Sequence, residues 1–106
     1  MITSFPDNLL LELKNLSIAS ESEIVGFIKD NIFQQVNNIH PDSKNYFLIN
    51  SKDIKDLNSG YILFHSHPIH IELDGFSEWD LENQKYSCIP MLLYSVKHNK
   101  FYYSPC

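Results

Sequence analysis

The chain has 106 residues, 43% of them hydrophobic and 13% aromatic, which predicts one globular domain with a single buried core. Its net charge is −5, and because arginine is absent from the sequence we do not expect a nucleic-acid-binding protein. The hydrophobic runs are short and interrupted and the first residues do not resemble a secretory signal, so we expect a cytoplasmic protein without a membrane-spanning segment.

The first predicted element is an amphipathic helix over residues 7–17. Asp7 stands where its charge favours the positive end of the helix dipole. Four leucines recur at helical spacing and are expected to face the core rather than a cofactor: Leu9, Leu10, Leu13 and Leu16. A polar loop over residues 17–22 follows.

Two runs of β-forming residues then predict a hairpin. Residues 23–28 form its first strand, residues 29–31 its turn and residues 32–36 its returning strand. Turn-forming residues over 37–44 predict a loop, and the apolar segment 46–49 predicts a short strand after that loop.

The middle of the chain predicts a short helix and a buried strand. Residues 51–57 suit a helix capped by Ser51. Residues 61–64 are a continuous apolar run, which is typical of a strand buried on both faces. Pro68 is expected to end that strand.

The last part of the chain predicts a third helix and a second hairpin. Residues 77–86 suit a helix with Ser77 at its N-cap, and residues 90–96 and 101–103 suit two strands around a turn at residues 98–99. The order of elements predicts an α/β domain. Its mixed sheet is expected to be flanked by an N-terminal helix, a short middle helix and a helix after the buried strand.

The two cysteines, Cys88 and Cys106, lack the spacing of a metal-binding or redox motif. In a reducing compartment we interpret Cys88 as a core residue and Cys106 as a terminal residue without a role. A disulfide between them stays open at this point.

Two histidines follow the predicted buried strand and suggest a metal site. His65 and His67 stand at positions i and i+2 of an extended segment, so their side chains point to the same side and can share one ion. A buried imidazole pair is costly unless something satisfies it. With one more protein ligand the site would keep a position for water, as catalytic zinc sites do. We interpret His40 and His98 as bystanders.

The other site candidates come from two different elements. Asp80 is the expected third ligand, and Ser77, three residues earlier on the same helix face, would reach the same space. The Ser-x-x-Asp spacing is also what a helix N-cap requires, so on its own it predicts only a helix start. Glu23 is the candidate general base for a metal-activated water, and the Ser77 hydroxyl would stabilise the oxyanion.

Three segments, Glu23-Ile-Val-Gly26, His65-Ser-His-Pro68 and Ser77-Glu-Trp-Asp80, together resemble the JAMM signature of the Jab/MPN metallopeptidases. The match spans nearly the whole domain. The resemblance implies a Jab/MPN-like fold and a zinc-dependent peptidase that hydrolyses a peptide or isopeptide bond. It also implies one zinc ion held by His65, His67 and Asp80, with Glu23 as the acid/base and Ser77 as the oxyanion partner.

Among its subgroups the chain is most similar to the Jab-like domain of phage tail-assembly proteins. That similarity implies a protein or peptide substrate and, as partners, a tail assembly or an NlpC-type cell-wall peptidase. It also implies a location in the host cytoplasm or the virion. The chain is too short for the insertions that grip ubiquitin in specialised relatives, so we do not expect deubiquitination.

The segment between His67 and Ser77 is longer than is usual in this family. The extra residues bring His70, Glu72 and Asp74, which are near enough in sequence to approach the metal, and their role stays open. The family often has cysteine at the position of Val25, which is not a ligand.

Two other interpretations remain open. In the first, the domain is a non-catalytic Jab-fold module that serves as a structural or docking part of a tail assembly. In the second, it is a domain similar to the RadC proteins, which share the H-x-H-P motif and a later S-x-x-D motif. The absence of arginine argues against DNA work. The sequence also leaves open whether the ion is zinc or another divalent metal.

Overall fold

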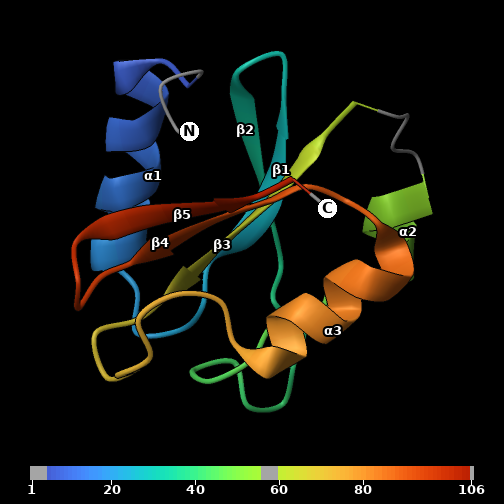
Figure 1. Ribbon diagram of the computed structural model, residues 1–106. Coiled ribbons are helices and arrows are strands. Elements are labelled where there is room, and N and C mark those ends of the chain that lie inside the picture. Colours follow the sequence, from blue (N-terminus) through green and yellow to red (C-terminus); the bar gives the residue numbers. More distant parts are fainter. Residues whose placement is uncertain (1–4, 56–59, 106) are drawn as a thin grey trace.

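A five-stranded mixed sheet runs through the centre of the computed structural model, which describes residues 5–55 and 60–105. The strand order is β2-β1-β3-β4-β5 (Figure 1). β1 pairs antiparallel with β2 and β3, β3 pairs parallel with β4, and β4 pairs antiparallel with β5. The strands are β1 (Val25–Lys29), β2 (Ile32–Val36), β3 (Ile62–His67), β4 (Met91–Ser95) and β5 (Lys100–Ser104). The predicted mixed sheet is therefore confirmed.

Three helices accompany the sheet among the described residues: α1 (Asp7–Ile18), α2 (Ser51–Lys55) and α3 (Glu78–Ser87). Figure 1 shows α1 on one side of the strands and α3 on the other. None of the helices in the described part of the chain is long and apolar enough to cross a membrane.

The face of the sheet under α1 holds the main hydrophobic core. Leu9 and Leu13 of the predicted leucine stripe are buried there, which confirms the helix and its inward face. They belong to one cluster with Phe5, which precedes α1, and with four side chains of the three central strands, namely Ile28, Phe64, Leu92 and Tyr94. Each such leucine contributes roughly 1.5–3 kcal/mol by leaving water.

The predicted hairpin is confirmed as β1 and β2. Asp30 and Asn31, with φ of 53° and 63°, occupy the two left-handed positions that a tight two-residue hairpin turn needs. Gly26 in β1 is required for close packing, because a Cβ there would lie 2.4 Å from the backbone oxygen of Gln34 and 2.5 Å from the ring of Phe33. The C-terminal hairpin of β4 and β5 is confirmed too.

The predicted strand over residues 46–49 is wrong. Only Ile49 forms a bridge, to Asn38, and the rest of the segment is irregular. The Asn38 side chain forms hydrogen bonds with backbone groups that would otherwise pair with a neighbouring strand. Its Nδ2 donates to Tyr46 O (3.0 Å), and its Oδ1 accepts from Leu48 N (3.1 Å).

Two smaller predictions are also corrected. Ser51 is the first helical residue of α2 rather than its cap, because the Oδ1 of Asn50 accepts the bond from Lys52 N (3.1 Å). The predicted end of this helix, at residues 56–57, lies outside the described residues. Cys88 is exposed at the C-cap of α3 rather than buried in the core, since the chain turns left-handed there (φ 51°) and leaves the helix. Cys106 lies outside the described residues.

Candidate metal centre

β3 positions the two histidines on the face of the sheet opposite α1. It is the middle strand, paired with β1 through Val25↔His65 and with β4 through His65↔Leu93. His65 and His67 are 0% and 2% exposed, and both point toward α3, because residues two apart on a strand share a face. The strand ends before Pro68, as predicted.

The first turn of α3 brings Asp80 to these histidines. Its Oδ2 lies 3.1 Å from Nε2 of His65 and 3.2 Å from Nε2 of His67. The same Oδ2 accepts a hydrogen bond from the backbone N of Ser77 (3.0 Å), while Ser77 Oγ accepts one from the backbone N of Asp80 (3.1 Å). This is a capping box, so the capping interpretation of the Ser-x-x-Asp pattern is confirmed. The cap also aims the carboxylate at the imidazoles.

Glu23 reaches the site from the segment just before β1. Its backbone N donates to Ser43 O (2.8 Å), and its side chain is buried, with 3% exposed. A carboxylate oxygen of Glu23 and ring nitrogens of His65 and His67 all lie within 4.8 Å of one another. These three buried side chains could therefore hold a metal ion, and we call Glu23, His65 and His67 the metal-capable group.

Several buried polar atoms at this site have no hydrogen-bond partner, and a metal ion would supply a partner to one nitrogen of each imidazole and to a carboxylate oxygen. Among the described residues, Oε1 of Glu23, both ring nitrogens of His65 and Nδ1 of His67 are buried without a hydrogen bond. His65 Nε2 is close to Asp80 Oδ2 but is not aligned as a donor or acceptor. Buried polar atoms without partners are rare and costly in folded proteins. The donor set, imidazole nitrogen with carboxylate oxygen, is that of zinc sites.

The spacing of these atoms also suits a tetrahedral ion. Zinc lies about 2.0–2.2 Å from nitrogen and oxygen ligands, so two ligand atoms of one tetrahedron are about 3.3–3.5 Å apart. The two Asp80 contacts, at 3.1 and 3.2 Å, are close to that edge length. Asp80 could therefore join the two histidines at an ion, although the three groups whose ligand atoms all lie within 4.8 Å of one another are Glu23, His65 and His67. Glu23 lies nearby as a fourth group.

The two carboxyl groups of the site are held in opposite protonation states. Burial, followed by the charges of Asp80 and Asp42, raises the pKa of Glu23 from 4.5 to about 9. Burial acts on Asp80 in the same direction, but attraction to His65, the contacts of both imidazoles and the Ser77 amide outweigh it and lower the pKa of Asp80 far below its usual range. In the metal-free protein Asp80 is the anion and Glu23 holds the proton.

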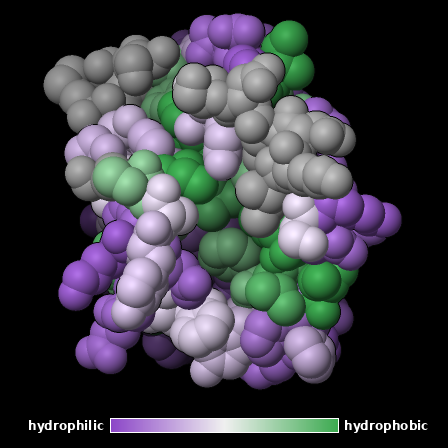
Figure 2. Space-filling view, turned by 90° about the vertical axis from the view of Figure 1, so that its right-hand side faces the viewer, coloured by the Kyte–Doolittle hydropathy of each residue, from purple (hydrophilic) through white to green (hydrophobic). Residues whose placement is uncertain are grey.

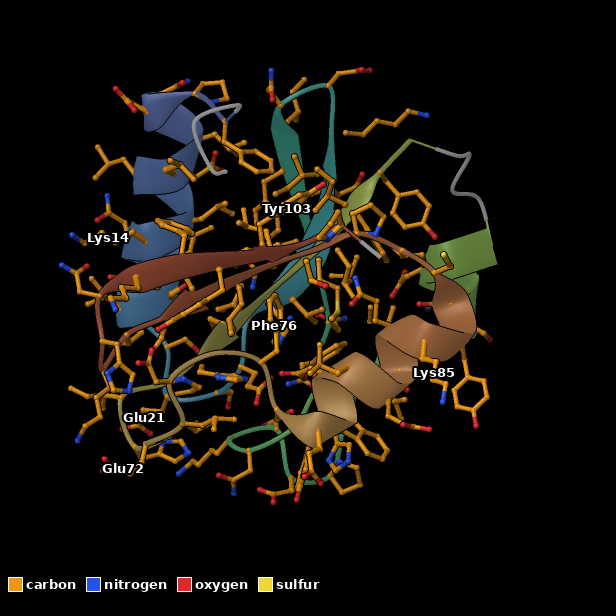
Figure 3. All side chains as sticks on the ribbon, viewed as in Figure 1. Lys14, Glu21, Glu72, Phe76, Lys85 and Tyr103 are labelled. Carbon is orange, nitrogen blue, oxygen red and sulfur yellow. The ribbon has the colours of Figure 1, made fainter. Side chains whose placement is uncertain are left out.

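The polar side chains of the long loop between His67 and Ser77 bond to residues other than His65 and His67, although His70 and Glu72 line the same cleft as His67. Glu72 pairs with Lys97 (3.0 Å), Asp74 accepts a hydrogen bond from Tyr102, and His70 Nε2 meets Asn45 Oδ1 (3.1 Å). Figure 3 shows Glu72 on the outer part of this loop, away from α3, and Phe76 between the sheet and α3. Phe76 packs beside His65, with ring centroids 6.1 Å apart.

The remaining histidines have structural contacts. His40 Nδ1 accepts a hydrogen bond from Asp42 N (2.9 Å), and His98 Nε2 lies 2.9 Å from Glu72 O. Neither belongs to the metal-capable group found among the described residues.

Three residues that support the site could not be singled out from the sequence. Ser66, between the two histidines, faces the other way and its Oγ accepts from Ile24 N (2.8 Å), which fixes the segment carrying Glu23. Asn38 donates to Glu23 O (3.1 Å) and organises the following loop. That loop places the Phe47 ring 4.7 Å from the His65 ring, where it helps to exclude water.

Two hollows of the described structure lie beside α3, and His67 of the metal-capable group lines the larger of these two. A cleft of about 570 Å³ is bordered by His67, Ser77 and Trp79, and a smaller hollow of about 200 Å³ lies between α3 and the sheet, with Trp79 in its wall as well. Figure 2, which views the side carrying α2 and α3, shows apolar surface in a depression among polar side chains. The metal-capable group thus borders a cavity of the size that small ligands or peptide segments use.

Comparison of the chain with protein-family models and with curated proteins yields no match.

Proposed function

We propose that this protein is a zinc-dependent metallopeptidase of the Jab/MPN type, with His65, His67 and Asp80 as the zinc ligands. The observation that carries the proposal is the position of Asp80 Oδ2, 3.1 and 3.2 Å from the two Nε2 atoms in a buried site. Sheet order and the helix after β3 support the fold assignment, and the resemblance of the three motifs supports the family and its phage tail setting.

Zinc bound there would act as a Lewis acid and lower the pKa of water toward neutrality. Glu23 would accept a proton from the attacking water at its carboxylate and later give it to the leaving amine, as the C–N bond breaks and the new C–O bond remains. Glu23 lies close to both histidine rings, and the positive charge of a bound zinc ion would offset the burial that raises its pKa, so that its carboxyl group would be ionised when water attacks.

Ser77 has a hydroxyl proton left for catalysis. Its Oγ accepts from Asp80 N, so the O–H is not needed for the cap and can donate to the oxyanion of the substrate. The cap would therefore hold the donor in place before substrate arrives. Phe47 and Phe76 beside His65 would keep bulk water from the ligand side.

The proposal is tested by metal content and hydrolysis together. Protein purified without added metal should contain about one zinc per chain, His67→Ala should lose it, and the off-site control His98→Ala should keep it. Glu23→Ala should retain zinc and lose cleavage of a peptide library followed by mass spectrometry. A wild-type protein without zinc would refute the proposal, whereas zinc without any cleavage would favour a structural module.

A further inference from the structure

The cleft beside His67 combines apolar walls with acidic side chains. Its apolar lining consists of Tyr46, Ile71, Leu73 and Trp79. Three of these are large side chains left substantially in water, with 42% of Tyr46, 46% of Leu73 and 46% of Trp79 exposed. Exposed large apolar side chains that converge on one cavity mark a binding surface more often than a chance arrangement.

The walls come from two loops and one helix that are already held in place. The ring of Tyr46 meets Trp79 edge-on, with centroids 5.9 Å apart, and it also contacts the ring of His40, with centroids 5.1 Å apart. The loop carrying Leu73 is linked to the β4–β5 turn through the Lys97–Glu72 ion pair (3.0 Å). A ligand would therefore enter a largely preformed site at little ordering cost.

The cleft is lined by acidic side chains and by no lysine. These acidic side chains are Glu72 and Glu78. Glu72 is already paired with Lys97, but Glu78 is exposed and has no ion pair within the described part of the chain. A cationic side chain of a ligand would complement Glu78, and the net charge of −5 adds long-range attraction for cations.

We propose that the cleft binds an extended peptide segment in which a large apolar side chain lies close to a lysine or arginine. The apolar side chain packs between Trp79, Tyr46 and Leu73, and the cation lies near Glu78. This inference rests on the proposed function, because the segment would present its backbone to the metal beside His67. A volume of about 570 Å³ is enough for a few residues of such a segment.

Trp79 makes the test direct, because it is the only tryptophan of the chain and forms part of the wall. Zinc-loaded Glu23→Gln protein, which should not cleave, is titrated with acetyl-Gly-Leu-Lys-Gly-amide while Trp79 fluorescence and calorimetry are followed. Comparison peptides replace Leu by Gly or Lys by Glu. We expect the Leu-Lys peptide to bind roughly tenfold to a hundredfold more tightly than the Gly-Lys peptide.

Leu73→Ser should reduce this preference, whereas Leu81→Ser, at an equally exposed leucine of α3 outside the cleft, should keep it. Equal binding of all peptides by zinc-loaded protein, or calorimetric binding without a Trp79 response, would overturn the inference and leave the metallopeptidase proposal standing. A protein that discriminates among the peptides but takes up no zinc would support the cleft and overturn the enzyme proposal.

Discussion

Replacing Glu23 by glutamine should stabilise the metal-free protein, and by an amount that grows with pH. The carboxyl group is 3% exposed, and its pKa rises from 4.5 to about 9 on folding. Between these values the unfolded chain has released the proton while the folded chain keeps it. Stability of the wild-type protein is therefore complete below pH 4.5 and falls as pH rises toward about 9.

The size of the effect follows from the same two values. At pH 7.5, three units above 4.5, the loss is about 4 kcal/mol, at about 1.36 kcal/mol per unit. At pH 5 it is less than about 1 kcal/mol. Glutamine has a similar shape and no proton to lose. The free energy of unfolding of the variant should therefore exceed that of the wild type by these amounts at these pH values.

The assay is urea unfolding of both proteins in chelator, followed by circular dichroism at several pH values between 5 and 8. Glu12→Gln, at an exposed acid of α1, controls for removal of a carboxyl charge elsewhere. A gain in unfolding free energy from Glu23→Gln that stayed constant with pH, or an equal gain from Glu12→Gln, would refute the prediction. Either result would show that burial beside Asp80 does not raise the pKa of Glu23.

Four further predictions concern the support of the site. Ser77→Ala should cost about 1 kcal/mol of stability and lower the cleavage rate, while Ser77→Thr should retain both, as measured by thermal unfolding and peptide hydrolysis. Gly26→Ala should destabilise the fold by about 1–3 kcal/mol in chemical denaturation, because the new methyl group meets the Gln34 carbonyl. Asn38→Leu should cost about 2–4 kcal/mol and speed amide exchange in the loop that follows, because several backbone groups lose their partner. Removing metal with a chelator should lower the melting temperature and adding zinc should restore it, with about 2.7 kcal/mol expected at zinc a hundredfold above Kd; unchanged melting would argue against a bound ion.

Local sequence patterns correctly predicted those elements that depend only on residues near one another in the chain. The leucine repeat predicted α1 and its buried face, and the turn residues predicted both hairpins. Ser77 and Asp80 predicted the start of α3, because a cap is made within four residues. The sequence could not predict the irregular 46–49 segment, because the Asn38 side chain, eight to ten residues away, takes the hydrogen bonds of Tyr46 O and Leu48 N. The prediction that Cys88 is a core residue was also wrong, because Cys88 is the left-handed C-cap of α3 and is exposed.

The proximity of the candidate site residues could be predicted because most of the site consists of two local units. Strand alternation puts His65 and His67 on one face, and the capping box aims Asp80 from the first turn of α3, so one tertiary distance remains to be satisfied. Ser66 then explains how Glu23 joins them. The alternation that turns both histidines toward α3 turns Ser66 to the opposite face, where its hydroxyl and amide hold both backbone groups of Ile24, next to Glu23. The His-Ser-His triplet thus uses both faces of one strand, because one face presents the two imidazoles and the other holds the segment that carries Glu23.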